Sequence, residues 1–293
     1  MDIAKRNQIL EYVALVIIIL SSFALLLLWR NPNISSEYSI AFFLGTAVLA
    51  AFLSSLIHEL GHLVIGLLLK FRFEFFIAGP LGIIRKENKI KVVLNTNPIL
   101  AGGCVGVLPI DYSSHNIKKL AKIVIAGPLF SLFFAIIFYS LSWFYNNQSA
   151  FILVTLAVLC LASFFSTTIP SKAGSFFSDR KIWQRLRKKG NPQNEELALL
   201  KIKTQTAKEE SYKNINPEDI NTLINSDILQ IKTYGLFHSL CKQIEEQGTT
   251  DSLIKQQFEE LSKKTSKFLQ LGYNTILTEL QEKYKHEKSQ IST

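Results

Sequence analysis

The pattern of apolar and polar positions divides the chain into two parts. Up to about residue 170, long apolar runs alternate with short polar segments, whereas residues 190–293 contain no apolar run long enough to cross a bilayer. A helix needs about 20 predominantly apolar residues to cross the hydrocarbon layer. The pattern therefore predicts a membrane-embedded part followed by a soluble part, and a chain of 293 residues is long enough for both.

Four apolar runs predict transmembrane helices. The first, residues 10–29, is long and has no obvious small-residue cleavage site near Trp29, so we interpret it as a retained helix and not as a signal peptide. The other three are predicted at about residues 39–69, 123–145 and 150–170. The third of the four runs contains Gly127-Pro128, which we expect in the first turns of its helix, where proline bends or loosens the backbone.

Residues 71–117 resemble neither a clean span nor a soluble domain. Three strand-like runs, FRFEFFI, LGIIRK and KIKVVL, include a predicted hairpin turn at Glu87-Asn88, and a glycine-rich stretch, AGGCVGV, follows them. Irregular backbone at membrane depth must face protein or a water-filled cavity. We therefore predict a small sheet and a loop that lies at the membrane, or dips into it, beside the second helix.

Residues 190–293 show helical periodicity. Asn216-Pro217 and Thr250-Asp251 are typical helix starts, and amphipathic stripes follow them. The predicted fold is a mainly α-helical integral membrane protein with about four transmembrane helices, a small membrane-associated β region and a C-terminal soluble helical domain. The predicted parts are an N-terminal helix with its loop, a membrane core and a cytoplasmic helical domain, at residues 1–37, 38–189 and 190–293.

The distribution of positive charge predicts the orientation in the membrane. Lys and Arg cluster in three segments, with six in 70–91, three in 118–122 and seven in 172–189, whereas the other side carries only Arg30. Because positive residues favour the cytoplasmic side, both termini are predicted to be cytoplasmic. Four spans with cytoplasmic termini and a basic pI fit a bacterial plasma membrane, and a membrane of a eukaryotic organelle is the alternative. These flanking residues explain the net charge of +9, and no nucleic-acid-binding motif accompanies it.

The second apolar run contains the motif H-E-x-x-H, made of His58, Glu59 and His62. Ionisable groups at membrane depth are costly and by default indicate a functional site. The histidines lie one helical turn apart and can reach one metal ion such as Zn²⁺, and Glu59 is close enough to take a proton from a water that the metal activates. The alternative, three core residues satisfied by helix neighbours, is disfavoured because an unpartnered glutamate in hydrocarbon is expensive.

A catalytic zinc site usually has three protein ligands, so a third is expected elsewhere in the chain. Near the membrane the candidates are Glu74, Asp111, His115 and Asp179. The pattern favours Asp179 over each of the others without deciding, because the preceding Phe176-Phe177 could hold its loop against the membrane. The three cysteines are scattered, with no C-x-x-C, which argues against a thiolate site or a disulfide framework.

These motifs resemble those of the site-2 protease family of intramembrane zinc metalloproteases, over residues 38 to about 183. HELGH in the second span carries most of the resemblance. Ala126-Gly127-Pro128 is similar to the family's glycine-proline segment. Thr167-Thr168-Ile169-Pro170, followed by Ser178-Asp179, is similar to the family's Asn-x-x-Pro … Asp-Gly motif, with a longer loop before the aspartate.

The resemblance implies a zinc protease that cuts substrate helices within or near the membrane. It implies that His58, His62 and Asp179 are metal ligands and that Glu59 is the general base. It also implies that an edge strand in the 71–108 region pairs with unwound substrate, which exposes the scissile backbone.

Three positions depart from the family's pattern. Thr167 and Ser131 stand where asparagines are expected, and Arg180 replaces the glycine that follows the aspartate. The asparagines of the family are associated with holding substrate or polarising its carbonyl. The candidate substrate or oxyanion residues are therefore Gly127, Pro128, Ser131 and Thr167.

The leading hypothesis is hydrolysis of peptide bonds in membrane-embedded or membrane-associated substrates. One rival is a different membrane metalloprotease with a glutamate as third ligand, but no good downstream glutamate occurs in a membrane helix. The other rival is a catalytically degenerate, zinc-binding membrane adaptor, in which residues 190–293 bind a cytoplasmic partner. An intact set of metal ligands together with Glu59 argues against the adaptor.

Overall fold

The computed structural model describes residues 39–86, 89–96, 100, 102–110, 115–169, 172–173 and 176–291. The predicted helix at 10–29, the predicted turn at Glu87-Asn88 and the candidate ligand Asp111 lie outside these residues. The chain forms two compact units. One consists of the chain up to Lys172 together with Phe177–Gln184, and the other of Ala173–Phe176 together with Arg185–Thr293.

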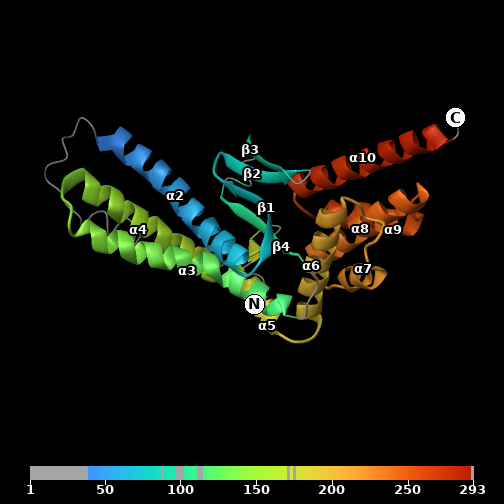
Figure 1. Cartoon of the computed structure of the whole chain (residues 1–293), viewed down its shortest axis with the longest axis horizontal. Coiled ribbons are helices and arrows are strands. Elements are labelled where there is room, and N and C mark those ends of the chain that lie inside the picture. The colour runs from blue at the N-terminus through green and yellow to red at the C-terminus, as the bar shows by residue number, and fades with distance from the viewer. Residues whose placement is uncertain are drawn as a thin grey trace. The chain divides into compact units, whose positions relative to one another are not determined.

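Three helices of the first unit are long and apolar enough to cross a membrane. They are α2 (Ser39–Leu68), α3 (Asn116–Ser142) and α4 (Asn147–Thr168). Each of them packs against the other two, and Figure 1 shows them running alongside one another. Three of the four predicted spans are thus present, and the first span stays a prediction.

The predicted start of α3 was wrong. The helix begins at Asn116 and not near Ile123, because its first turns carry lysines and so fall outside the apolar run. Gly127-Pro128 therefore lies near the middle of α3 and not in its first turns. Pro128 is fully buried there, and the helix continues beyond it to Ser142.

Close packing joins α2 to α3 beside the H-E-x-x-H motif. A Cβ atom at Gly61 would lie 2.7 Å from the carbonyl oxygen of Ala126 and 2.8 Å from the Cβ of Phe130. Small residues allow transmembrane helices to approach closely. Gly61 therefore lets this part of α2 lie directly against α3.

The predicted small sheet is present and lies at the C-terminal end of α2 (Figure 1). Its antiparallel strands have the order β3-β2-β1-β4. Phe71 and Val107 from the sheet pack with Ile123 of α3 and with apolar residues of α2. The strands are β1 (Phe71–Ala78), β2 (Leu81–Lys86), β3 (Lys89–Leu94) and β4 (Cys104–Pro109), and a further pair of two-residue strands comprises β5 (Lys172–Ala173) and β6 (Phe176–Phe177).

The chain beyond β6 is helical. Its helices are α5 (Asp179–Arg187), α6 (Asn191–Glu209), α7 (Pro217–Ile224), α8 (Leu229–Gln247), α9 (Ser252–Ser262) and α10 (Lys267–Ile291). The predicted helix starts at Asn216 and Asp251 are confirmed, since both side chains accept hydrogen bonds from backbone N–H groups of the first turn. An apolar core that includes Phe237, Phe258 and Tyr273 joins α8, α9 and α10.

The sequence pattern predicted a helical region from residue 190 onwards, which includes α6, but it did not predict α5, whose contact with α6 is partly ionic. Arg185 of α5 is buried between two buried glutamates of α6, and its guanidinium donates to Glu195 and to Glu196 at 2.5 Å each. Buried charges are tolerated when they are paired and hydrogen-bonded. Apolar periodicity cannot reveal an interior contact of this kind.

Candidate metal centre

Two buried imidazoles of α2 point at the same place. His58 and His62 lie on one face of the helix because they are four residues apart. Their Nε2 atoms are 3.3 Å apart, and both residues are less than 10% exposed. This geometry agrees with the prediction that both side chains can reach one metal ion.

Helix α3 fixes the orientation of both rings. The Nδ1 of His62 lies 2.8 Å from the backbone carbonyl oxygen of Ile123, which can only accept, so this nitrogen donates. The Nδ1 of His58 lies 3.0 Å from the hydroxyl of Ser131. With Nδ1 held in this way, the Nε2 of each ring points to the space between the two imidazoles, where a metal ion could bind. Metal-binding histidines in other proteins are also oriented by a hydrogen bond at the ring nitrogen that does not bind the metal.

Asp179 brings a carboxylate to the two histidines. It is the first residue of α5, and its Oδ2 lies 3.1 Å from the Nε2 of His58 and 3.5 Å from the Nε2 of His62. Burial raises the pKa of the Asp179 carboxyl, but its interactions with the imidazoles of His58 and His62 outweigh burial and lower the pKa to about 2. The carboxylate is therefore charged, as a metal ligand must be.

The three atoms fit a tetrahedral divalent metal. Zinc binds histidine nitrogen and carboxylate oxygen at about 2.0–2.2 Å, and tetrahedral geometry then places neighbouring ligand atoms about 3.3–3.5 Å apart. The observed separations of 3.1, 3.3 and 3.5 Å agree with this value. Within the described residues, His58, His62 and Asp179 form the one group of three potential ligands close enough to share an ion.

Among the described residues, the candidate ligands Glu74 and His115 take no part in this group. Glu74 lies on β1 and accepts a hydrogen bond from Arg72 at 2.5 Å, so its carboxylate already has a cationic partner. His115 lies at the N-cap of α3.

Glu59 is buried beside the ligands and is covered by the loop that precedes β4. The hydroxyl of Ser55 donates to the carbonyl oxygen of Gly102 at 2.7 Å, which holds this loop on α2. Gly103 has a φ of 103°, and a Cβ atom there would lie 2.7 Å from the Oε1 of Glu59. The sequence identified this stretch only as a glycine-rich loop, and no signal in it showed the contact with Glu59.

Because of this contact, we expect substitution of Gly103 to lower the activity strongly. We expect Gly103→Ala to lower the turnover rate by at least about tenfold, because the new methyl group meets the Glu59 carboxylate and a positive φ strains alanine by about 1–3 kcal/mol. Metal content should stay unchanged, since the atoms nearest to a Cβ at Gly103 belong to Glu59 and Ser55 and not to a ligand. Gly102→Ala is the matched control, because a Cβ there meets nothing within 4 Å. Equal activity of the two variants in a cleavage assay would refute a role of this contact.

Gly127 lies where the ring of His62 meets α3. A Cβ at Gly127 would collide with the Nε2, Cε1 and Cδ2 atoms of this ring. Only glycine therefore leaves room for the His62 ring, which contacts the carbonyl oxygen of Ile123 with Nδ1 and approaches the Nε2 of His58 with its own Nε2. The predicted substrate-contacting residue Gly127 is thus placed beside a metal-ligand candidate, and Pro128 follows it in the buried interior of α3.

The two hydroxyl candidates for the substrate site lie in different environments. Ser131 is completely buried, and its hydroxyl contacts His58. Thr167 is half-buried, and its hydroxyl donates to the carbonyl oxygen of Ser163 in its own helix, at 2.9 Å. The structure therefore brings Ser131 to the histidines, whereas the hydroxyl of Thr167 is bonded within its own helix. Arg180, the third departure, stacks over the ring of Trp183 at 4.5 Å.

Ser131→Ala should weaken metal binding by about 10–100-fold, the usual effect of losing a group that orients a metal-binding histidine. Ser142→Ala is the matched control, since Ser142 lies on the same helix, is also buried, and donates only to the carbonyl oxygen of Tyr139. Competition with a metal chelator measures both affinities. A Ser131 variant that holds zinc as tightly as the Ser142 variant would exclude this positioning role.

Comparison with known proteins identifies the family. A family model described as Peptidase family M50 matches residues 46–290. The chain belongs to peptidase family M50. The resemblance to site-2 proteases is thereby confirmed, and membership in M50 supports an intramembrane metalloprotease in general. No curated protein and no solved structure matches the chain.

Proposed function

We propose that this M50 member is a zinc-dependent endopeptidase that hydrolyses peptide bonds of membrane-embedded or membrane-associated substrates. The observation that carries the proposal is the convergence of His58, His62 and Asp179 beside Glu59, on and next to a helix apolar enough to span a membrane. A buried cluster of this composition is expensive in hydrocarbon unless it serves a function.

The residues of the cluster have separate roles in this proposal. His58, His62 and Asp179 would hold the zinc ion, which when bound acts as a Lewis acid and lowers the pKa of water towards about 7. Glu59 takes the proton of the attacking water and later delivers it to the leaving amine. Ser131 and the Ile123 carbonyl keep the two imidazoles in the required orientation.

The substrate backbone needs an extended conformation at this site, since a helix conceals its peptide bonds. Strand β4 lies at an edge of the described sheet and begins directly after Gly103, the residue against Glu59. We propose that an unwound substrate segment adds to this sheet as a further strand, so that its main chain passes the Glu59 carboxylate. The natural substrate would then be a transmembrane or membrane-bound polypeptide.

The orientation and the location are also part of the proposal. Lysines follow the C-terminal end of α2 at Lys70 and lie in the first turns of α3 at Lys118 and Lys119, and positive residues of this kind support a cytoplasmic location for these two helix ends. His62 lies six residues before the end of α2, about 9 Å along the helix at 1.5 Å per residue. We propose a bacterial plasma membrane, cytoplasmic termini, and a cytoplasmic partner for residues 190–293.

Membrane proteomics with a trapping variant tests the proposed activity. Cells that express Glu59→Gln in place of the unaltered chain should accumulate a membrane precursor, and the unaltered chain should convert it into shorter fragments. Glu74→Gln is the control, because Glu74 pairs with Arg72 and is not in the metal-ligand group. Identical proteomes, with zinc present in both proteins, would favour the degenerate adaptor.

A further inference from the structure

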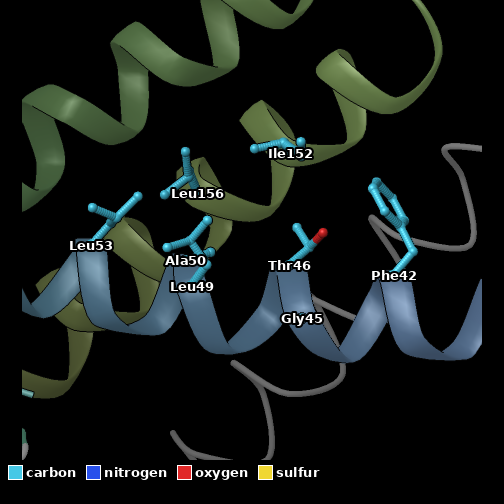
Figure 2. A pocket seen from close by; sticks show the side chains of 8 residues that line it. All are labelled: Phe42, Gly45, Thr46, Leu49, Ala50, Leu53, Ile152 and Leu156. Atoms are coloured by element: carbon cyan, nitrogen blue, oxygen red, sulfur yellow. The ribbon is translucent and has the colours of Figure 1, made fainter.

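An apolar groove lies along the N-terminal half of α2, beside α4 (Figure 2). It has a volume of about 250 Å³. Its lining consists of Phe42, Gly45, Thr46, Leu49, Ala50 and Leu53 from α2 and Ile152 and Leu156 from α4. The groove is smaller than the pockets of about 300–1,000 Å³ that take small molecules, and it lacks converging polar groups. These properties suit apolar side chains of a neighbouring helix.

Small residues let another backbone come close to this part of α2. Gly45 is exposed, and a Cβ atom there would meet no other atom within 4 Å. Leu49, on the wall of the groove, is 53% exposed. Interfaces between transmembrane helices are enriched in small residues for this reason.

We propose that this groove is the packing site of the chain's own apolar segment, residues 10–29. The described part of the chain begins at Ser39, three residues before Phe42 at the end of the groove. Packed helices lie about 8–10 Å apart, and the nine residues 30–38 can extend up to about 30 Å, so the connection is long enough. Short connections also favour antiparallel neighbours.

The lengths of the two segments are compatible with this packing. In the proposed arrangement, a helix at 10–29 that rises by 1.5 Å per residue would bring Ser21 level with Ala47, because each is eight residues, or about 12 Å, from the connection. Ser21 and Ser22 would then face the part of the groove around Gly45 and Leu49. Small residues on both helices allow close contact there.

The location of the groove argues against a substrate helix as its occupant. Leu53 is five residues from His58, about 7.5 Å along α2, and Phe42 is sixteen residues from it, about 24 Å. The groove therefore ends about 7.5 Å short of His58, and its apolar lining gives a substrate backbone no contact with the metal ligands. A lipid chain is the other possible occupant of the groove. It would give no disulfide cross-link between the groove and residues 10–29, so the experiment below distinguishes it.

Disulfide cross-linking of the full chain in native membranes tests the proposal. Leu49→Cys is combined with a cysteine at Leu20, Ser21, Ser22 or Phe23, four successive positions that cover every face of the segment. A protease site is inserted in residues 30–38, so that cleavage separates the N-terminal segment from the rest of the chain. After oxidation and cleavage, a cross-linked protein still runs as one band on a non-reducing gel, whereas a protein without the cross-link runs as two fragments. The native Cys104, Cys160 and Cys241 all follow the protease site, so an introduced N-terminal cysteine could also cross-link to one of them. Variants that carry only the N-terminal cysteine, without Leu49→Cys, measure this background.

Leu49→Cys should cross-link with one or two of the four positions, at a yield several-fold above that of Ala51→Cys. Ala51 is the matched control, because it is exposed and lies about 200° around α2 from Leu49. Leu53→Cys, one turn further along the groove, is the second test position if Leu49→Cys does not accumulate. Equal yields for Leu49 and Ala51, no cross-link at either groove position, or cross-links only between differently tagged copies would overturn the proposal.

Discussion

Glu59→Gln is expected to lower the rate of peptide-bond hydrolysis by about 10²–10⁴-fold while zinc stays bound. The amide has nearly the same shape as the carboxylate but cannot take a proton from water, and general-base catalysis contributes about this factor. Glu59 does not belong to the group of three atoms that fit a metal ion, so its replacement leaves the ligands in place. Purified protein in detergent or liposomes, with a transmembrane substrate, allows both the rate and the zinc content to be measured.

Glu74→Gln is the control for this change of charge. Glu74 is a partly buried acid on β1 whose partner is Arg72, so its variant should retain the full rate. If Glu59→Gln cleaved at the unaltered rate, Glu59 could not be the general base. If it lost zinc together with activity, Glu59 would have to be assigned a role in holding the metal.

Asp179→Ala is expected to weaken zinc binding by more than about 100-fold and to abolish cleavage with it. Loss of a residue that only orients a ligand already costs about 10–100-fold in affinity, and Asp179 offers a ligand atom itself. Its removal also leaves the two imidazoles of His58 and His62 without their carboxylate partner. Competition with a metal chelator gives the affinity, and a cleavage assay at saturating zinc shows whether activity can be restored.

Arg180→Gln separates this effect from a general disturbance of α5. Arg180 is the next residue, and its guanidinium stacks on Trp183 of the same helix. We expect this variant to keep its zinc, although arginine stands where the family has glycine. Comparable zinc affinity in Asp179→Ala and in the unaltered chain would contradict the assignment of Asp179 as a ligand.

Much of the architecture could be predicted from the sequence because its signals are local. Apolar runs identify α2, α3 and α4, since spanning a bilayer requires length and hydrophobicity alone. Strand-like runs with a turn predict the β2–β3 hairpin, and H-E-x-x-H places two imidazoles on one face of α2. For Asp179, the pattern of residues left several alternatives, and only the resemblance to site-2 proteases favoured it strongly.

The remaining features depend on contacts between distant segments, which no local pattern encodes. The sequence offered Ser131 only as a substrate or oxyanion candidate and gave no sign that its hydroxyl contacts His58, 73 residues away in the sequence. Gly103 covers Glu59 because a loop folds back onto α2, and its glycine-rich sequence alone does not show which side chain it meets. Helix α5 contacts α6 through an ion-paired arginine, and apolar periodicity does not reveal a contact of this kind.

X-ray absorption spectroscopy of the purified protein at the zinc edge tests the central claim most directly. The geometry of His58, His62 and Asp179 predicts one zinc per chain with two imidazole nitrogens and light oxygen neighbours, at about 2.0–2.2 Å and without sulfur. The same spectrum should persist in Glu59→Gln and be lost or altered in Asp179→Ala. A chain without zinc, a sulfur ligand, or a spectrum unchanged by the loss of Asp179 would contradict this metal centre.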